Sequence, residues 1–339
     1  MTLVVIDADV LGRQRTGDET YVRNLLRALP GPAAAAGLRL AAVTRRPDLV
    51  PSGIEVVELP ARSQELRMAW SLPHLLGRLR AGLVHTQYAI PLRSPCSAVV
   101  TIHDLSFEDD ALMGRRDRLV FRRVVPRAAR RAARVLTVSE RTKRDLVARY
   151  DLAPERVVVT PNGVDPAFAP EGERARGSPY VLAVGAIQER KNQRAALAAA
   201  REVGLELVVV GPTKDERVAT ELVAGGARLE GYVTIERLAA LYRGAACVVQ
   251  ASRHEGFGLP VVEAMASGAP VVVVPDPALV EVAGEAAIVV AETALADGIR
   301  RALAERERLA AAGLERARAF TWEAAARTTV EVYVEALGA

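Results

Sequence analysis

The sequence predicts an α/β protein made of two parallel-sheet domains, and three observations support this fold class. The chain has 339 residues, enough for two domains of ordinary size with a core each. Short β-branched runs alternate with longer alanine- and leucine-rich stretches, which is typical of parallel sheets flanked by helices. A segment dense in proline and glycine, residues 161–179, interrupts the alternation as a linker does. We therefore expect an N-terminal domain over 1–165, a second domain over 166–320, and a helix over 321–339 that crosses back onto the first domain.

The strands of both sheets are predicted from the apolar runs in chain order. In the first domain the expected strands are residues 4–6, 40–43, 83–85, 98–102, 135–138 and 157–160. In the second domain they are residues 180–184, 207–210, 228–229, 247–249, 271–274 and 288–290. Open parallel sheets bind ligands beyond the carboxyl ends of their strands, so two facing sheets would place a site in a cleft between the domains.

The composition is that of a soluble globular protein, with 50% hydrophobic and 25% charged residues. The opening residues, MTLVVID, lack the basic-then-apolar layout of a secretion signal, and no apolar run approaches the roughly 20 residues that span a bilayer. Cys96 and Cys247 lie far apart and outside any metal-binding spacing, so we interpret both as reduced packing residues. These observations predict a cytoplasmic protein.

Positive charge is concentrated in the first half of the chain. Residues 1–165 hold 26 Lys and Arg against 18 Asp and Glu, whereas the whole chain has a net charge of +4. Within residues 115–134, from Arg115 to Arg134, apolar residues recur between arginines at helical spacing, which predicts a pair of basic amphipathic helices broken at Pro126. Two interpretations stay open: a solvated face, or a peripheral contact with anionic lipid at the inner face of the plasma membrane. Nucleic acid is disfavoured as a partner, because aromatic residues make up only 4% of the chain.

The segment 253–265 carries the strongest chemical signal. Glu255 and Glu263 lie eight residues apart, around a turn with Gly256 and Gly258 and a helix that starts at a proline. Glycine lets the backbone approach a ligand, and the first helical turn offers unpaired N–H groups to an anion. The two carboxylates can accept hydrogen bonds from sugar hydroxyls. This combination predicts a polyhydroxylated, phosphorylated ligand.

Two further groups are expected at strand ends. Gly185 closes a strand of the second domain and precedes Arg190 and Lys191, whose cations suit a diphosphate and would stabilise charge on a leaving group. His103, followed by Asp104, ends a strand of the first domain, at the edge where such sheets bind ligands. The structural alternatives are a solvated basic turn and a satisfied core histidine.

Two segments of the first domain give weaker signals. Gly17 lies in a loop that feeds an amphipathic helix and would let the backbone approach phosphates, although the spacing is not that of a dinucleotide-binding loop. Asp7 and Asp9 mimic a two-aspartate metal motif, but no further ligand lies near them in sequence. We therefore do not interpret them as a metal site.

Together these motifs resemble glycosyltransferase family 4, a retaining family of GT-B fold whose members carry an E-x7-E motif. The resemblance spans nearly the whole chain. In the second half it includes EGFGLPVVEAMASG from Glu255, ERKN from Glu189, PNGVD from Pro161 and FTWE from Phe320. In the first half, TIHDL and TVSE are similar to segments of bacterial mannosyl- and rhamnosyltransferases of surface polysaccharide synthesis.

The resemblance implies two Rossmann-like domains facing across a cleft and a role for each motif. Glu263 is expected to bind the nucleotide ribose and Glu255 the hydroxyls of the donor sugar. Arg190 and Lys191 should hold the diphosphate, and His103 should contact the sugar near the reacting carbon. The expected catalytic residues are His103, Arg190, Lys191 and Glu255. The expected donor-binding residues are Gly17, Gly185, Arg190, Lys191, Tyr232, Val233, Glu255, Gly256, Phe257, Gly258, Leu259 and Glu263.

The implied reaction is transfer of a hexosyl unit, mannose-like by the resemblance, from a nucleotide-diphosphate sugar to a hydroxyl of a glycan or lipid-linked acceptor. Retention of configuration and the absence of a metal or other cofactor are implied as well. Where many relatives have a second glycine after the first strand, this chain has Glu19, whose carboxylate would repel phosphates, so we expect it to point towards the acceptor or solvent. Two alternatives stay open: another GT-B enzyme, either a nucleotide-sugar epimerase or a phosphorylase, and a non-catalytic sugar-nucleotide binding protein.

Overall fold

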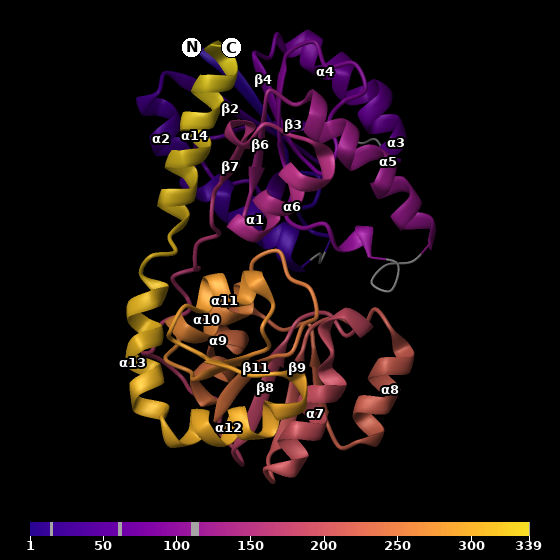
Figure 1. The fold of residues 1–339 in the computed structure, drawn as a ribbon. Coiled ribbons are helices and arrows are strands. Elements are labelled where there is room, and N and C mark those ends of the chain that lie inside the picture. Colours follow the sequence, from indigo (N-terminus) through magenta and orange to yellow (C-terminus); the bar gives the residue numbers. More distant parts are fainter. Residues whose placement is uncertain (14–15, 60–62, 110–114, 339) are drawn as a thin grey trace. The chain divides into compact units, whose positions relative to one another are not determined.

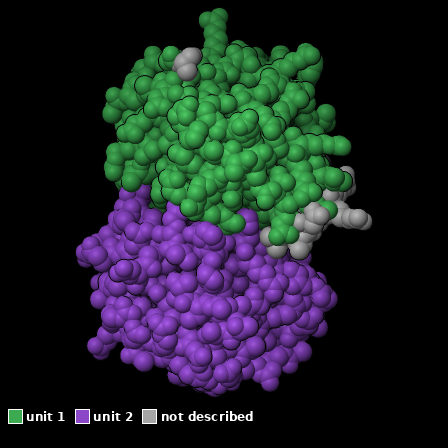
Figure 2. Space-filling model, in the orientation of Figure 1, with its two compact units in different colours: residues 1–163, 322–339 green, residues 164–321 purple. Residues whose placement is uncertain are grey.

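The computed structural model describes residues 1–13, 16–59, 63–109 and 115–338, and the chain divides into two compact units. The first unit comprises Met1–Gly163 and Trp322–Ala339, and the second comprises Val164–Thr321 (Figure 2). Each unit holds one sheet, and every strand pair in both sheets is parallel, as the alternation of strands and helices predicts.

The sheet of the first unit has seven strands in the order β3-β2-β1-β4-β5-β6-β7. The strands are β1 (Thr2–Asp7), β2 (Leu38–Thr44), β3 (Glu55–Glu58), β4 (Leu83–Gln87), β5 (Ser97–Thr101), β6 (Arg134–Thr137) and β7 (Val157–Val159). Six of them match the expected runs. The edge strand β3 was not predicted, because its sequence EVVE is short and its side chains are mostly exposed.

Helices cover both faces of this sheet (Figure 1). They are α1 (Thr16–Ala28), α2 (Pro30–Ala35), α3 (Gln64–Leu66), α4 (Leu72–Leu79), α5 (Arg115–Arg131), α6 (Glu140–Tyr150) and the C-terminal helix α14 (Trp322–Gly338). A short π-helical segment, Arg67–Ser71, joins α3 to α4. Among the helices that the structure describes, none is long and apolar enough to cross a membrane.

The C-terminal helix α14 packs on the first unit, as expected, and contacts α1 (Figure 1). Buried residues recur along it every three or four positions, at 322, 326, 329, 333 and 336, so one stripe of the helix faces the core. Trp322 and Tyr333 belong to the same apolar cluster as Tyr21 of α1. The last helix therefore completes the core of the first unit.

Helix α5 corrects one prediction. It runs without a break from Arg115 to Arg131, with Pro126 inside it, so the expected pair of helices is wrong. A proline removes one backbone hydrogen bond and bends a helix, but does not end it when tertiary packing holds both sides. Here Val125 and Ala128, on either side of the proline, are buried in one apolar cluster.

The sheet of the second unit has six strands in the order β10-β9-β8-β11-β12-β13, and all six were expected. They are β8 (Tyr180–Val184), β9 (Glu206–Val210), β10 (Arg228–Gly231), β11 (Cys247–Gln250), β12 (Val271–Val273) and β13 (Ile288–Val289). The helices are α7 (Gln193–Glu202), α8 (Glu216–Ala224), α9 (Ile235–Gly244), α10 (Leu259–Ala266), α11 (Pro277–Ala283), α12 (Leu295–Ala304) and α13 (Arg306–Ala317). The strand order reverses between β8 and β11, the point at which open parallel sheets bind ligands.

Candidate functional site

The loops that follow β8 and β11 bring the charged residues of the second unit together. Lys191 Nζ lies 2.5 Å from Glu255 Oε1, and Arg190 Nη1 lies 3.3 Å from Glu255 Oε2. Arg190 also donates to the backbone oxygen of His254, and its own carbonyl accepts from the N–H of Arg253. The two loops are therefore joined by both side-chain and backbone contacts.

Glu255 is a buried, ionised carboxylate. Its side chain is only 8% exposed, and Gln250 Nε2 also donates to Oε1, at 2.7 Å. Burial opposes its charge, but Lys191 and Arg190 outweigh burial and hold the pKa of Glu255 well below its usual range. The expected diphosphate-binding cations are thus paired with Glu255 before any ligand is present.

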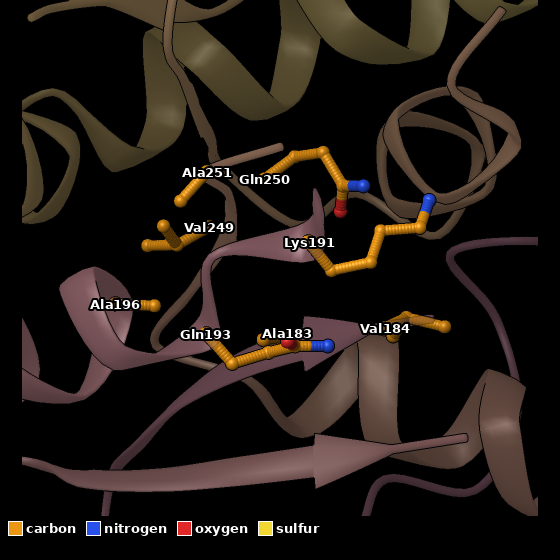
Figure 3. Close-up of a pocket in the computed structure, with 8 residues that line it drawn as sticks. All are labelled: Ala183, Val184, Lys191, Gln193, Ala196, Val249, Gln250 and Ala251. Atoms are coloured by element: carbon orange, nitrogen blue, oxygen red, sulfur yellow. The ribbon is translucent and has the colours of Figure 1, made fainter. Parts of the chain in front are cut away.

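A small cavity lies beside this cluster, between the ends of β8 and β11. Lys191, Gln193 and Gln250 supply its polar lining, and Figure 3 shows the ends of Lys191 and Gln250 on the same side of it. The Oε1 atom of Gln193 is buried and accepts no hydrogen bond from the residues that the structure describes. The cavity wall therefore carries polar side chains from the loops and helix that follow β8 and from β11.

Two glycines shape the backbone at the site. Gly258, the residue before α10, has φ of 100°, and a Cβ there would lie 2.7 Å from Leu279 Cδ2. Gly185, at the end of β8, has φ of 141°. Both conformations favour glycine, and α10 begins directly after Gly258, at the carboxyl edge of the sheet. Gly256 and Phe257 are buried in the same turn, and Leu259 begins the helix.

Glu263 lies in α10 and differs from Glu255 in its electrostatic state. It accepts a hydrogen bond from the hydroxyl of Tyr242 at 2.8 Å, with both side chains buried. Burial raises the pKa of Glu263 to about 7; the Tyr242 hydrogen bond lowers it, and the charge of Asp165 raises it. Glu255 is therefore ionised, whereas the pKa of Glu263 lies near 7.

Tyr232 and Val233 follow β10 at the same edge of the sheet, and Tyr232 is exposed. Sequence reasoning missed three residues that hold the site: Gln250 and Tyr242, described above, and Asp276. The carboxylate of Asp276 caps α11 and also accepts from the backbone N–H of Glu255 at 3.3 Å. An aspartate directly before a proline is a helix-start signature, so Asp276 was open to detection.

His103 belongs to the first unit and follows β5. Its side chain is buried, and its Nε2 atom has no hydrogen-bond partner among the described residues. Burial lowers the pKa of His103, whereas the charges of Asp18 and Asp104 raise it. Asp104 also accepts from the backbone and hydroxyl of Ser106. The histidine thus presents an unsatisfied ring nitrogen at the carboxyl edge of the first sheet.

Helix α1 corrects a second prediction. Glu19 is buried and accepts from the N–H of Gly12 at 3.0 Å and from Arg23, so its expected orientation towards solvent is wrong, whereas an orientation towards the acceptor stays a prediction. The carboxylate closes the loop before the helix, because the N–H of Gly12 needs an acceptor. Gly17 is exposed and lies in the first turn of α1 rather than in the loop.

The two aspartates after β1 are held by arginines. Arg67, which is 2% exposed, pairs with Asp7 and, at 3.3 Å, with Asp9. Asp9 also contacts Arg45 at 2.8 Å and Arg13. Within the described residues, no group of three or more His, Cys, Asp or Glu side chains could hold a metal ion.

The two cysteines differ in burial: Cys247 is buried in β11, whereas Cys96 is partly exposed. Both are free thiols, and burial raises the pKa of Cys247 to about 12. Neither is placed for nucleophilic chemistry.

Two parallel sheets, with charged residues at the switch point of the second, place the chain in the class of open α/β proteins that bind ligands at the carboxyl ends of their strands. Family models match both halves of the chain: "Glycosyltransferase Family 4" over residues 15–168 and "Glycosyl transferases group 1" over residues 166–319. The chain belongs to this glycosyltransferase family.

Curated relatives cover parts of the chain. O-antigen chain mannosyltransferase B of Escherichia coli is 29% identical over 66% of this chain and 64% of its own length. The MMP alpha-(1->4)-mannosyltransferase of Mycolicibacterium hassiacum is 35% identical over 47% of this chain and 41% of its own. The match thus spans less than two thirds of the length of each.

Solved structures match over the whole chain. Sucrose-phosphate synthase from Thermosynechococcus elongatus superposes with a TM-score of 0.77 at 20% identity and 98% coverage of both chains. WaaG, a glycosyltransferase involved in lipopolysaccharide biosynthesis, gives a TM-score of 0.75 at 17% identity, covering 97% of this chain and 99% of its own. At such identities the likeness shows the GT-B fold alone.

Proposed function

We propose that this protein transfers a hexosyl unit, mannose-like, from a nucleotide-diphosphate sugar to a hydroxyl of a glycan or lipid-linked acceptor. The transfer proceeds with retention of configuration and without a metal. The observation that carries the proposal is the pairing of Arg190 and Lys191 with buried Glu255 at the start of α10, with Glu263 in the same helix in a different protonation state.

Each group of the cluster suits one part of the donor. The ammonium of Lys191 and the guanidinium of Arg190 match a diphosphate. Glu255 accepts hydrogen bonds from the sugar hydroxyls, and Glu263 accepts them from the ribose. The backbone around Tyr232 and Val233 is left for the base.

The same cations stabilise the reaction. As the bond between the sugar and the diphosphate breaks, negative charge grows on the phosphate oxygen, where Arg190 and Lys191 are already ordered by Glu255. The acceptor oxygen bonds to the anomeric carbon on the face from which the diphosphate leaves, and the departing phosphate oxygen takes the proton of the acceptor hydroxyl, so the configuration is retained. His103, with its unsatisfied Nε2, is assigned to the transferred sugar near the reacting carbon.

A mannose-like donor is supported by the relatives, because those compared above are mannosyltransferases, as is the O-antigen chain mannosyltransferase RfbU of Salmonella typhimurium, 29% identical over 60% of this chain. A nucleotide-bound state is supported by a structural neighbour, the Anabaena protein HepE, which was solved with UDP and glucose. The base and the acceptor stay open in the proposal.

Steady-state kinetics with purified protein and a panel of nucleotide-diphosphate sugars test the proposal. Arg190→Ala should lower kcat about a hundredfold, the effect of losing one preorganised charge stabiliser. Glu263→Ala should mainly raise the KM for the donor. Arg194→Ala is the matched control, since Arg194 pairs with Glu189 and Glu221 outside the cluster. Unchanged kinetics for both site variants, or an inverted product by NMR, would reject the proposal.

We also propose that the protein acts at the inner face of the plasma membrane, docking through α5. Leu119, Val120 and Val124 are 58%, 47% and 37% exposed, and the exposed Arg123 and Arg127 lie on the same face of the helix. Apolar side chains flanked by arginines match an anionic lipid surface, where each cation contributes about 1 kcal/mol.

Vesicle co-sedimentation tests this docking. Arg123→Ala/Arg127→Ala should weaken binding to phosphatidylglycerol vesicles roughly thirtyfold, from about 2 kcal/mol for the two charges. Leu119→Ser should weaken it as well, whereas Val223→Ser, at an equally exposed position on α8, should not. Equal binding to neutral and anionic vesicles, or indifference to salt, would restore the solvated-face interpretation.

A further inference from the structure

A buried chain of hydrogen bonds in the first unit links the C-terminal helix to strand β5. The hydroxyl of Tyr333, on α14, lies 2.6 Å from His85 Nδ1. The other ring nitrogen of His85, Nε2, lies 2.7 Å from Thr101 Oγ1, and that hydroxyl lies 3.0 Å from the hydroxyl of Tyr21. The four side chains are between 0% and 1% exposed, so solvent does not compete for these bonds.

The chain is satisfied at every step. Burial lowers the pKa of His85 to about 3, so the ring is neutral and carries one donor and one acceptor nitrogen. Each ring nitrogen has one partner, Tyr333 on one side and Thr101 on the other. Removing a partner at one end leaves a buried nitrogen unpaired and changes the tautomer that the other end favours.

The far end of the chain supports His103. The ring of Tyr21 meets the His103 ring edge-on, with centroids 4.7 Å apart and planes at 80°. Tyr88 packs on His103 as well, with centroids 5.6 Å apart. Since His103 Nε2 has no hydrogen-bond partner within the described residues, these aromatic contacts hold its ring.

Helix α14 fixes Tyr21 from two sides. Tyr333 is linked to the hydroxyl of Tyr21 by the hydrogen bonds through His85 and Thr101. Trp322, at the start of the same helix, packs on the Tyr21 ring with centroids 6.1 Å apart. Helix α14, which follows the whole second unit in sequence, therefore orders the side chains that pack around His103.

We propose that Tyr333 and His85 are positioning residues for His103, acting through Thr101 and Tyr21, so that the C-terminal helix is a working part of the transferase site. The proposal rests on the role of His103 proposed above. Neither side chain touches the substrate; both act through the orientation of the His103 ring.

NMR of the histidine rings in 15N-histidine-labelled protein tests the linkage without any assay of transfer. Tyr333→Phe removes one hydroxyl and keeps the ring. Its matched control is Thr329→Val, which removes a buried hydroxyl of the same helix that donates to Ala325 O at 2.7 Å. We expect the ring resonances of both His85 and His103 to move in Tyr333→Phe, and neither to move in the control.

Kinetics then test the consequence for catalysis. We expect Tyr333→Phe to lower kcat about ten- to a hundredfold, the effect of misplacing a group near the reacting atoms, while the KM for the donor changes by less than about twofold. Thr329→Val should leave kcat within about twofold of the parent. If the Tyr333 hydroxyl had a merely structural role, Tyr333→Phe and Thr329→Val would both lower the melting temperature, and neither would lower kcat while leaving KM unchanged.

Three outcomes overturn the proposal. The first is a His103 resonance that stays in place in Tyr333→Phe while that of His85 moves. The second is an equal kinetic loss in Thr329→Val. The third is additivity of Tyr21→Phe and Tyr333→Phe in the double variant, because members of one network must be non-additive. If Tyr333→Phe does not fold, Tyr21→Phe takes its place in both experiments. If no sugar nucleotide is turned over, the proposed function fails and the NMR experiment still decides the linkage.

Discussion

Glu263 is a buried carboxylate that pairs with no cation among the residues that the structure describes, and replacing it with glutamine should stabilise the protein at alkaline pH. The pKa of Glu263 is raised from 4.5 to about 7, with burial as the main cause. The native state therefore binds more protons than the unfolded state between these two values. The contribution of Glu263 to the free energy of unfolding is fully present below pH 4.5 and is lost as pH rises through 7.

The magnitude follows from the shift. Between pH 5 and pH 8, a carboxylate with these two pKa values loses roughly 2.5 kcal/mol of native stability. Glutamine is neutral, has nearly the same shape, and its Oε1 can still accept from Tyr242. The difference in unfolding free energy between Glu263→Gln and the parent should thus grow by that amount from pH 5 to pH 8.

Urea denaturation of the two proteins at both pH values measures this difference, and the subtraction removes all groups that titrate alike in both. Asp165→Asn provides a control, because loss of that charge should lower the pKa of Glu263 and reduce the pH-dependent gain. A constant difference across the pH range would refute the assignment of a raised pKa. A stabilised Glu263→Gln that no longer binds the donor would show that the carboxylate is retained for binding.

Three further outcomes are expected. Lys191→Met should destabilise the protein by about 3 kcal/mol in thermal or urea unfolding, because it removes a cation from buried Glu255, and the loss should shrink if Glu255 is also changed to Gln. Gly258→Ala should cost about 1–3 kcal/mol, since its φ of 100° and the buried Leu279 side chain both oppose a Cβ. Gly17→Ala, in open space on α1, should stabilise the folded protein by about 0.5 kcal/mol. Calorimetry should show weaker donor binding by this variant only if the Gly17 backbone contacts the phosphates of the donor.

The fold was largely predictable from sequence because central strands of a parallel sheet are buried on both faces and read as continuous apolar runs. The central strands β8, β9, β11 and β12 of the second sheet have this pattern. The edge strand β3 does not, since its two valines stand between exposed glutamates. The break predicted at Pro126 was wrong for a related reason. The cost of a proline inside a helix can be read from the sequence. The burial of Val125 and Ala128 that outweighs this cost depends on packing against other elements.

The site was predictable where neighbours in sequence share a loop. The Glu255 turn and the Arg190–Lys191 turn each follow a strand, and parallel strands end at one edge, so their proximity follows from topology. The partners of His85 were not predictable, since Tyr333 lies 248 residues away and no spacing relates the two. The burial of Glu19 was missed as well, because the N–H that it satisfies belongs to an irregular loop.

The two glutamates of the motif look equivalent in sequence, yet the structure gives them opposite electrostatic states. Glu255 sits where a second loop delivers two cations, so its charge is stabilised before a donor arrives. Glu263 meets a tyrosine hydroxyl and the repulsion of Asp165, and burial raises its pKa, so its charge is not stabilised in this way. On the ribose-binding role proposed above, a Glu263 that is half protonated near pH 7 accepts ribose hydroxyls fully only once ionised, and donor affinity is then expected to rise with pH through that range. Glu255, ionised throughout, adds no such dependence, so the pH profile of donor binding separates the two roles.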